Sequence, residues 1–130
     1  MKTVALLVTL LSLLSAAFAQ SPASSADDAC KKTEYAELKD SPKNRLLSTF
    51  CRYEAFRDIE AKAFDDFEAL AKKYGNDGDV DMARRALDSA NKHRLQSAQC
   101  SDEATRVARA LESVYHISRP TQAVCDARMK

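Results

Sequence analysis

The chain has 130 residues, with 20 Lys and Arg against 19 Asp and Glu and a formal net charge of +1. A balanced charge gives no general attraction to nucleic acid, whose recognition relies on an excess of positive charge. The sequence also lacks the polybasic block that binds an anionic membrane surface, and its length is that of one ordinary domain.

Residues 1–19, MKTVALLVTLLSLLSAAFA, have the layout of a secretory signal peptide. Lys2 supplies a basic start, residues 4–14 form an apolar run, and residues 17–19 (Ala-Phe-Ala) form a small-x-small cleavage site. The run is too short and wrongly flanked for a membrane span. We therefore expect a secreted, extracellular protein.

The remaining 111 residues carry 19 basic and 19 acidic side chains, because Lys2 is the one charged residue of the leader. We divide them into a flexible tail at residues 20–24 and a single helical domain at residues 25–130. Its core is thin, with 23 large apolar residues and 18 alanines in this stretch. Since alanine favours helix but buries little surface, such a domain gains from covalent cross-links.

The pattern of apolar residues predicts an all-α fold, a small disulfide-stapled bundle of four to five helices. The first helix is expected over residues 26–38. The second begins at residues 41–42 (Ser-Pro), a good N-cap followed by a proline, and runs to Tyr74, before Gly75. Its apolar spacing changes midway, which favours a bend near residue 60 and leaves open whether residues 43–74 form one continuous helix.

Two or three further helices are expected after the loop at residues 75–79. Val80 opens an apolar helical pattern that extends to Ala98. Residues 101–103 (Ser-Asp-Glu) read as a fresh N-cap with an acidic first turn, and predict another helix that ends before Pro120. Residues 121–130 form a short last helix or an extended tail.

Four cysteines, an even number in a small exported chain, indicate a disulfide framework. Antiparallel folding of the first two helices would bring Cys30 and Cys51 level. We therefore favour the pairing Cys30–Cys51 with Cys100–Cys125. The alternative is Cys51–Cys100 with Cys30–Cys125, because folding the next two helices together brings Cys51 level with Cys100.

Signatures of catalysis are lacking in the sequence. His93 and His116 are the only candidate bases at neutral pH, and neither lies in a nucleophile or metal motif. We expect His93, which stands between Lys92 and Arg94, on a solvated helix face. The prediction is a protein without enzymatic activity, catalytic residues or cofactor.

One acidic loop imitates a calcium site. Asp77, Asp79, Asp81 and Asp88 follow part of the spacing of an EF-hand loop, but its sixth position, which needs glycine, is Met82. We therefore predict no metal site, and interpret Asp79 as the N-cap of the following helix and Asp81 as an acid at its positive end.

The charges differ between the two central helices. Acids gather in the middle of the second helix and bases in the third. Antiparallel folding would bring Glu60 near Arg94, which indicates ion pairs across the bundle, each worth about 0–1 kcal/mol when exposed. The alternative interpretation is a dipolar surface that steers a charged partner.

Most aromatic residues lie on the second helix, and the core is their expected place. Tyr53 and Phe56 are the candidate contacts with a partner, since the apolar stripe winds around the helix and aromatic anchors dominate interface energies. We expect a secreted, non-enzymatic interaction protein (an effector, toxin or cytokine-like signal) that binds a macromolecular partner through its helical surface.

The alternative function is an extracellular carrier of a small apolar ligand. In its helical outline, its length and its two expected disulfides, the chain is similar to insect odorant-binding proteins with a reduced number of cysteines. The Cys-x-x-x-Cys pair of that family is absent here. A carrier must also line both a core and a cavity of about 300 Å³ or more, for which 23 large apolar residues are few.

Overall fold

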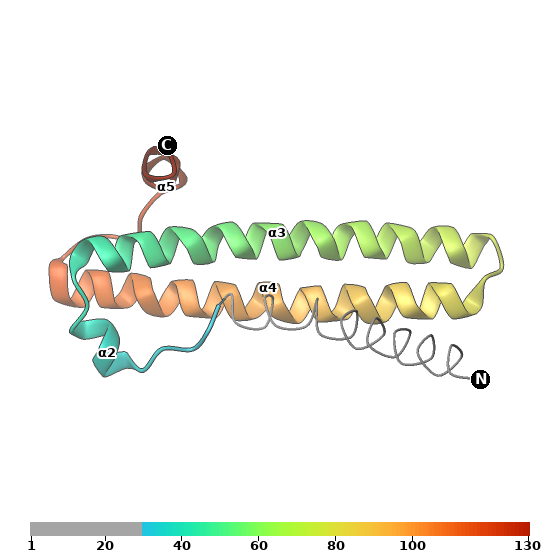
Figure 1. Cartoon of the computed structure of the whole chain (residues 1–130), viewed down its shortest axis with the longest axis horizontal. Helices are drawn as coiled ribbons and strands as arrows, with labels where there is room; N and C mark the ends of the chain where they lie inside the picture. Colours follow the sequence, from blue (N-terminus) through green and yellow to red (C-terminus); the bar gives the residue numbers. More distant parts are fainter. Residues whose placement is uncertain (1–29) are drawn as a thin grey trace, which may run out of the picture.

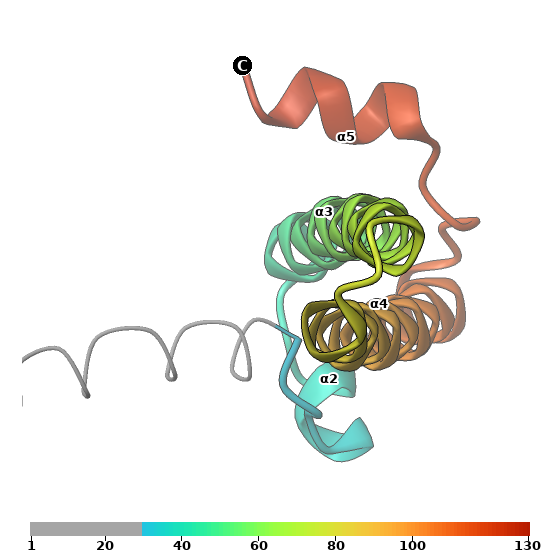
Figure 2. The same ribbon diagram turned by 90° about the vertical axis from the view of Figure 1, so that its right-hand side faces the viewer.

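The computed structural model describes residues 30–130, and its dominant feature is one long helical hairpin. Helix α3 (Lys43–Asn76) and helix α4 (Val80–Tyr115) run antiparallel, side by side, and are joined by a short turn (Figure 1). Two short helices, α2 (Tyr35–Lys39) and α5 (Gln122–Arg128), lie on opposite sides of the hairpin near one end (Figures 1 and 2). Helix α2 contacts α4, and α5 contacts α3.

The expected all-α class is confirmed for residues 30–130, which form four helices. The signal peptide and the tail at residues 20–24 lie outside the described residues, as does the start of the helix expected at residues 26–38. Within residues 30–130, no helix is long and apolar enough to cross a membrane.

Both long helices are continuous, whereas a bend near residue 60 and a break near residue 101 had been expected. Neither position carries a glycine or proline to interrupt the helix. The hydroxyl of Ser101 was expected to cap a new helix. Instead, its carbonyl accepts a hydrogen bond from Thr105 Oγ1 at 3.0 Å, inside an unbroken helix.

The ends of the hairpin helices follow local chemistry. Asp79 caps α4, as predicted, and its side chain accepts a hydrogen bond from the backbone N–H of Met82 at 3.1 Å. Gly78 has a φ of 82°, the left-handed conformation that glycine adopts without steric cost. At the start of α3 the prediction was wrong by one residue: Pro42 is the N-cap, and Ser41 Oγ donates to Glu37 O instead.

The first helix is shorter than expected, because residues 30–34 precede α2 without forming helix. Side chains of the hairpin bind this segment's backbone and so hold it in place. The carbonyl of Cys30 accepts from Gln99 Nε2, and that of Lys31 accepts from the Tyr53 hydroxyl.

The core sits at the end of the hairpin that carries α2 and α5. We call this part the head, residues 30–56 and 98–130, and the rest of the hairpin the arm, residues 57–97. Phe50, Leu46, Leu111 and Val107 are the largest fully buried side chains, and all lie in the head. The buried apolar residues of the arm are alanines only: Ala71, Ala86 and Ala90.

The disulfides join Cys30 to Cys100 and Cys51 to Cys125, so both pairings weighed from the sequence are wrong. Equal height along the hairpin does not decide the pairing, because side chains at the same height can point in opposite directions. The segment before α2 reaches α4 and places Cys30 at Cys100. Helix α5 lies on the side of α3 away from α4 and places Cys125 at Cys51 (Figure 2).

Candidate functional site

The two aromatic residues proposed as partner contacts lie in the head, and one of them is buried. Tyr53 is only 5 % exposed, with its ring in the core and its hydroxyl bonded to the carbonyl of Lys31, so it is not available to a partner. Phe56 is half-buried and packs against the core. The winding apolar stripe therefore turns inward at Tyr53, which belongs to the core and bonds to the segment before α2, and it becomes exposed further along the helix, at Ile59.

The exposed apolar side chains that the sequence did not single out lie mainly on the arm. Ile59, Leu70, Leu87 and Leu95 have exposed fractions of 59 %, 37 %, 48 % and 61 %. Leu87 and Leu95 belong to the apolar helical pattern expected after Val80, and such a pattern usually marks a buried face. Within residues 30–130, the two helices of the arm pack only on each other, so each of them keeps apolar positions that no other described element covers.

A groove of about 490 Å³ lies between α3 and α4 on the arm. Phe64 and Leu87 provide its large apolar side chains, and Ala71 and Ala90 lie between the helices. Polar and charged residues also line the groove: Glu68, Lys72, Asn91 and Arg94. A groove that combines exposed apolar side chains with polar and charged ones has the composition of an interaction surface.

The predicted ion pair between Glu60 and Arg94 does not form, since Glu60 meets His93 instead. Glu60 Oε2 and His93 Nδ1 are 2.5 Å apart, and the imidazole ring stacks on Phe67 with centroids 5.3 Å apart. His93 is therefore half-buried between the two helices and not on a solvated face. The neighbouring residue Arg94 points to the groove.

Other ion pairs of the arm lie within α3. Lys62 pairs with Asp66 and Lys72 with Glu68, each four residues apart along the helix. The hydrogen bond and the charge of Asp66 raise the pKa of the exposed Lys62 above its ordinary value. In the described part of the chain, no carboxylate pairs with the bases of α4 in the arm: Arg84, Arg85, Lys92 and Arg94. This arrangement favours the dipolar surface over a set of cross-bundle pairs.

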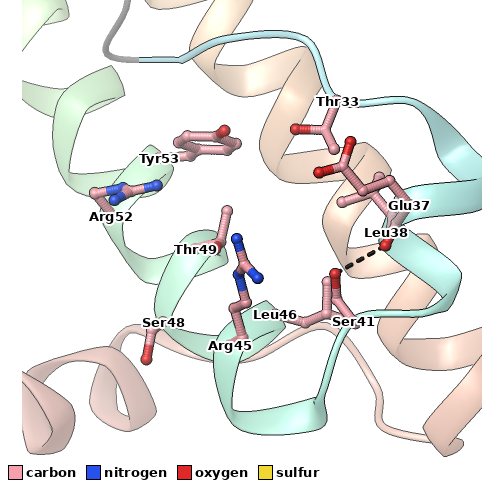
Figure 3. A pocket seen from close by; sticks show the side chains of 10 residues that line it. All are labelled: Thr33, Glu37, Leu38, Ser41, Arg45, Leu46, Ser48, Thr49, Arg52 and Tyr53. Atoms are coloured by element: carbon pink, nitrogen blue, oxygen red, sulfur yellow. Dashed lines mark hydrogen bonds between the residues drawn. The ribbon is translucent and has the colours of Figure 1, made fainter.

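A second hollow lies in the head, between α3 and the segment that contains α2 (Figure 3). Its volume is about 390 Å³, and seven of the ten residues that line it are polar or charged. Figure 3 shows Arg45, Thr49 and Arg52 along one side of α3, with Thr33 and Glu37 facing them across the hollow. We call this hollow the polar cleft.

A third hollow, of about 320 Å³, lies between α3 and α5 and is mostly apolar. Ala55, Phe56 and Ile59 line it from α3, and Met129 lines it from the end of the chain. We call it the apolar groove. Among residues 30–130, no group of three or more His, Cys, Asp or Glu residues is placed to hold a metal ion.

Comparison with protein-family models, with curated proteins and with solved structures finds no match for this chain. A functional argument therefore has to start from the chain's own residues and surfaces.

Proposed function

We propose that this is a secreted, non-enzymatic interaction protein, and that it binds an extracellular macromolecule through the exposed faces of its arm. One observation carries the proposal: within residues 30–130, more than half of the long hairpin is a pair of helices that no other element covers. Its buried apolar residues are three alanines, while five large aliphatic side chains, Val80 among them, remain at least 37 % exposed. A fold does not need so long an extension to complete its core, and exposed apolar patches of this kind mark interaction sites.

The charge of the arm supports a macromolecular partner. The bases of α4 lie on one helix without carboxylate partners in the described chain, beside an α3 that carries acids. Such a separation of charge orients an approaching partner and raises its association rate. A small apolar ligand would not make use of it.

Secretion is part of the proposal and is supported by the sequence and by the cysteines. Residues 1–19 have the composition of a signal peptide, and both disulfides need an oxidising compartment to form and persist.

The histidines support a role without catalysis. His93 is engaged by Glu60 and stacked on Phe67. His116 ends α4 in the left-handed conformation, and its backbone N–H bonds to Glu112 O. Within residues 30–130, no hydrogen bond joins either histidine to a Ser or Thr hydroxyl, and all four cysteines are cross-linked.

The carrier of a small apolar ligand is the alternative. The three hollows of about 390, 320 and 490 Å³ open to solvent along the helices. A carrier buries most of its ligand in an enclosed cavity, so this geometry favours the interaction protein.

The test measures binding of the oxidised protein, displayed as a tetramer, to arrayed extracellular domains and intact cell surfaces. The arm variant combines Leu70→Asp with Leu87→Asp, because both side chains are exposed and a charge there blocks apolar contact without entering a core. Val124→Asp is the matched control, since Val124 is 42 % exposed but lies on α5.

We expect saturable binding to at least one surface, a loss of at least about tenfold in the arm variant, and no change in the control. Equal binding by the arm variant would contradict the role of the arm. A protein that binds no surface but melts at higher temperature with apolar ligands would establish the carrier instead.

A further inference from the structure

We propose that the head binds a single-chain anionic amphiphile, with its anionic group at Arg52 and its apolar chain in the apolar groove. Except for Ile59, at the start of the arm, the residues that line this site belong to the head, and the proposal does not depend on the function proposed for the arm. Two adjoining hollows of different polarity meet at this site, at the same residues of α3.

The polar cleft and the apolar groove share Ser48 and Arg52 in their walls. Arg52 therefore stands at the boundary between a polar hollow and an apolar one. A ligand with a polar end and an apolar end can occupy both, whereas a purely polar or purely apolar ligand uses only one of them.

The apolar groove leaves two large side chains uncovered. Ile59 is 59 % exposed and Met129 is 62 % exposed, and Phe56 between them is half-buried. An alkyl chain lying in the groove would remove this apolar surface from water, which is favourable in proportion to the area covered. At about 320 Å³ the groove is near the lower limit of ligand sites, so it suits one chain and not two.

The charges around this boundary are positive and lack acidic partners. Within residues 30–130, none of Arg45, Arg52 and Arg128 forms an ion pair with a carboxylate. Arg52 lies over the ring of Tyr53, with 5.7 Å from its Cζ to the ring centroid. This stacking orients the guanidinium while leaving its N–H groups available.

Arg128 reaches the boundary from the other side. It donates long hydrogen bonds to Ser48 Oγ at 3.4 Å and to Asn44 Oδ1 at 3.3 Å, both neutral acceptors. Among residues 30–130, no acid lines the apolar groove, and Glu37, on the far wall, is the only acid lining the polar cleft. Carboxylate, phosphate and sulfate groups are the anions that arginine binds with paired hydrogen bonds, so they are the head groups this site fits.

The test is isothermal titration of the oxidised protein with sodium dodecanoate below its micelle concentration. Dodecanol, with the same chain but no charge, and inorganic phosphate, with charge but no chain, are the comparison ligands. We expect dodecanoate to bind at a single site, at least about tenfold more tightly than either. Dodecanol binding equally well would contradict the role of Arg52, and no binding of dodecanoate would overturn the proposal.

Two matched pairs of variants locate the site. Ile59→Glu places a charge in the apolar groove, and Leu95→Glu does the same at an equally exposed position of the arm, 61 % against 59 %. Arg52→Gln removes the proposed anion contact, and Arg84→Gln removes an exposed arginine elsewhere. We expect Ile59→Glu and Arg52→Gln to bind dodecanoate at least about tenfold more weakly, at unchanged melting temperature. Leu95→Glu and Arg84→Gln should bind it as tightly as the unmodified protein.

Equal losses in both members of a pair would mean that binding is not at this site, and would refute the proposal. Vesicles of phosphatidylserine provide the remaining comparison: binding to vesicles but not to monomeric dodecanoate would replace the single-chain ligand with a membrane surface. The arm variant with Leu70→Asp and Leu87→Asp should bind dodecanoate normally. Failure of this site is thereby distinguished from failure of the function proposed for the arm.

Discussion

Removal of the disulfide between Cys30 and Cys100 should destabilise the protein more than removal of the one between Cys51 and Cys125. The two cross-links close loops of nearly equal length, with sequence separations of 70 and 74 residues. Restricting the unfolded chain over loops of this size is worth about 4.4 kcal/mol for either one. Loop length alone therefore predicts no difference between them.

The native state makes the difference. Residues 30–42 are held to the hairpin by more than the disulfide: Leu38 is buried in the core, and the carbonyl of Ser41 accepts a 2.7 Å hydrogen bond from the Tyr115 hydroxyl. This segment should stay docked when Cys30 and Cys100 are changed to alanine. Only the unfolded state then gains conformational freedom, so the free energy of unfolding should fall by the full contribution of the disulfide, up to about 4 kcal/mol.

Helix α5 is held differently, because Cys125 is its only buried residue. Without the disulfide, α5 can leave the hairpin while the rest of the core remains folded. The conformational entropy of the native state then rises together with that of the unfolded state, so the free-energy difference between the two states changes less. We therefore expect a loss of about 2 kcal/mol or less for Cys51→Ala with Cys125→Ala.

Urea unfolding followed by circular dichroism gives both free energies, and amide hydrogen exchange shows which segment opens. Alanine is used because a buried serine hydroxyl would add its own cost. The expected pattern is a larger global loss for the first variant and loss of protection confined to α5 for the second. Equal losses, or a larger loss for the second variant, would refute the reasoning about the native state.

Three further outcomes are expected. Full reduction of both disulfides should leave a marginal or unfolded chain, because their combined contribution approaches the total of about 5–15 kcal/mol typical of a domain; equal melting temperatures of the reduced and oxidised forms would contradict this. Leu111→Ala should cost about 3–4 kcal/mol in urea unfolding, since Leu111 is 0 % exposed, whereas Leu95→Ala, at 61 % exposed, should change stability by about 0.5 kcal/mol or less. Gly75→Ala should raise the melting temperature, because Gly75 is helical with open space around it; Gly78→Ala should lower it by a similar amount, about 1 kcal/mol in stability, because its φ is +82°. Thermal unfolding of the two glycine variants side by side tests this, and a lower melting temperature for Gly75→Ala or a higher one for Gly78→Ala would contradict the prediction.

Much of the local structure was readable from the sequence. Few breakers and abundant alanine indicated an all-helical chain, and Asp79, Gly75 and Pro120 located helix ends to within a few residues. These features depend on contacts within one turn of the chain. The bend expected near residue 60 rested on a change in apolar spacing, and the break expected near residue 101 rested on a Ser-Asp-Glu sequence. Neither signal interrupts a helix as a glycine or proline does.

The candidate sites were not readable in the same way. Tyr53 and Leu87 both belong to apolar helical stripes, yet one is 5 % exposed and the other 48 %. The difference comes from residues 30–41, which contact the hairpin in the head: the carbonyl of Lys31 accepts the hydrogen bond of the Tyr53 hydroxyl, and Leu38 joins the same core. A periodic pattern states which face of a helix is apolar, but not whether another element covers that face.

The sequence by itself determined the helical class, the helix ends at the turn between α3 and α4, and the four cysteines available for cross-linking, since each follows from residue type and short-range spacing. Only the tertiary structure decided the pairing of those cysteines and the division of the hairpin into a packed head and a bare arm. Both depend on which side of the hairpin the terminal segments take. That choice is made by contacts about 70 residues apart in the chain, where local spacing carries no information.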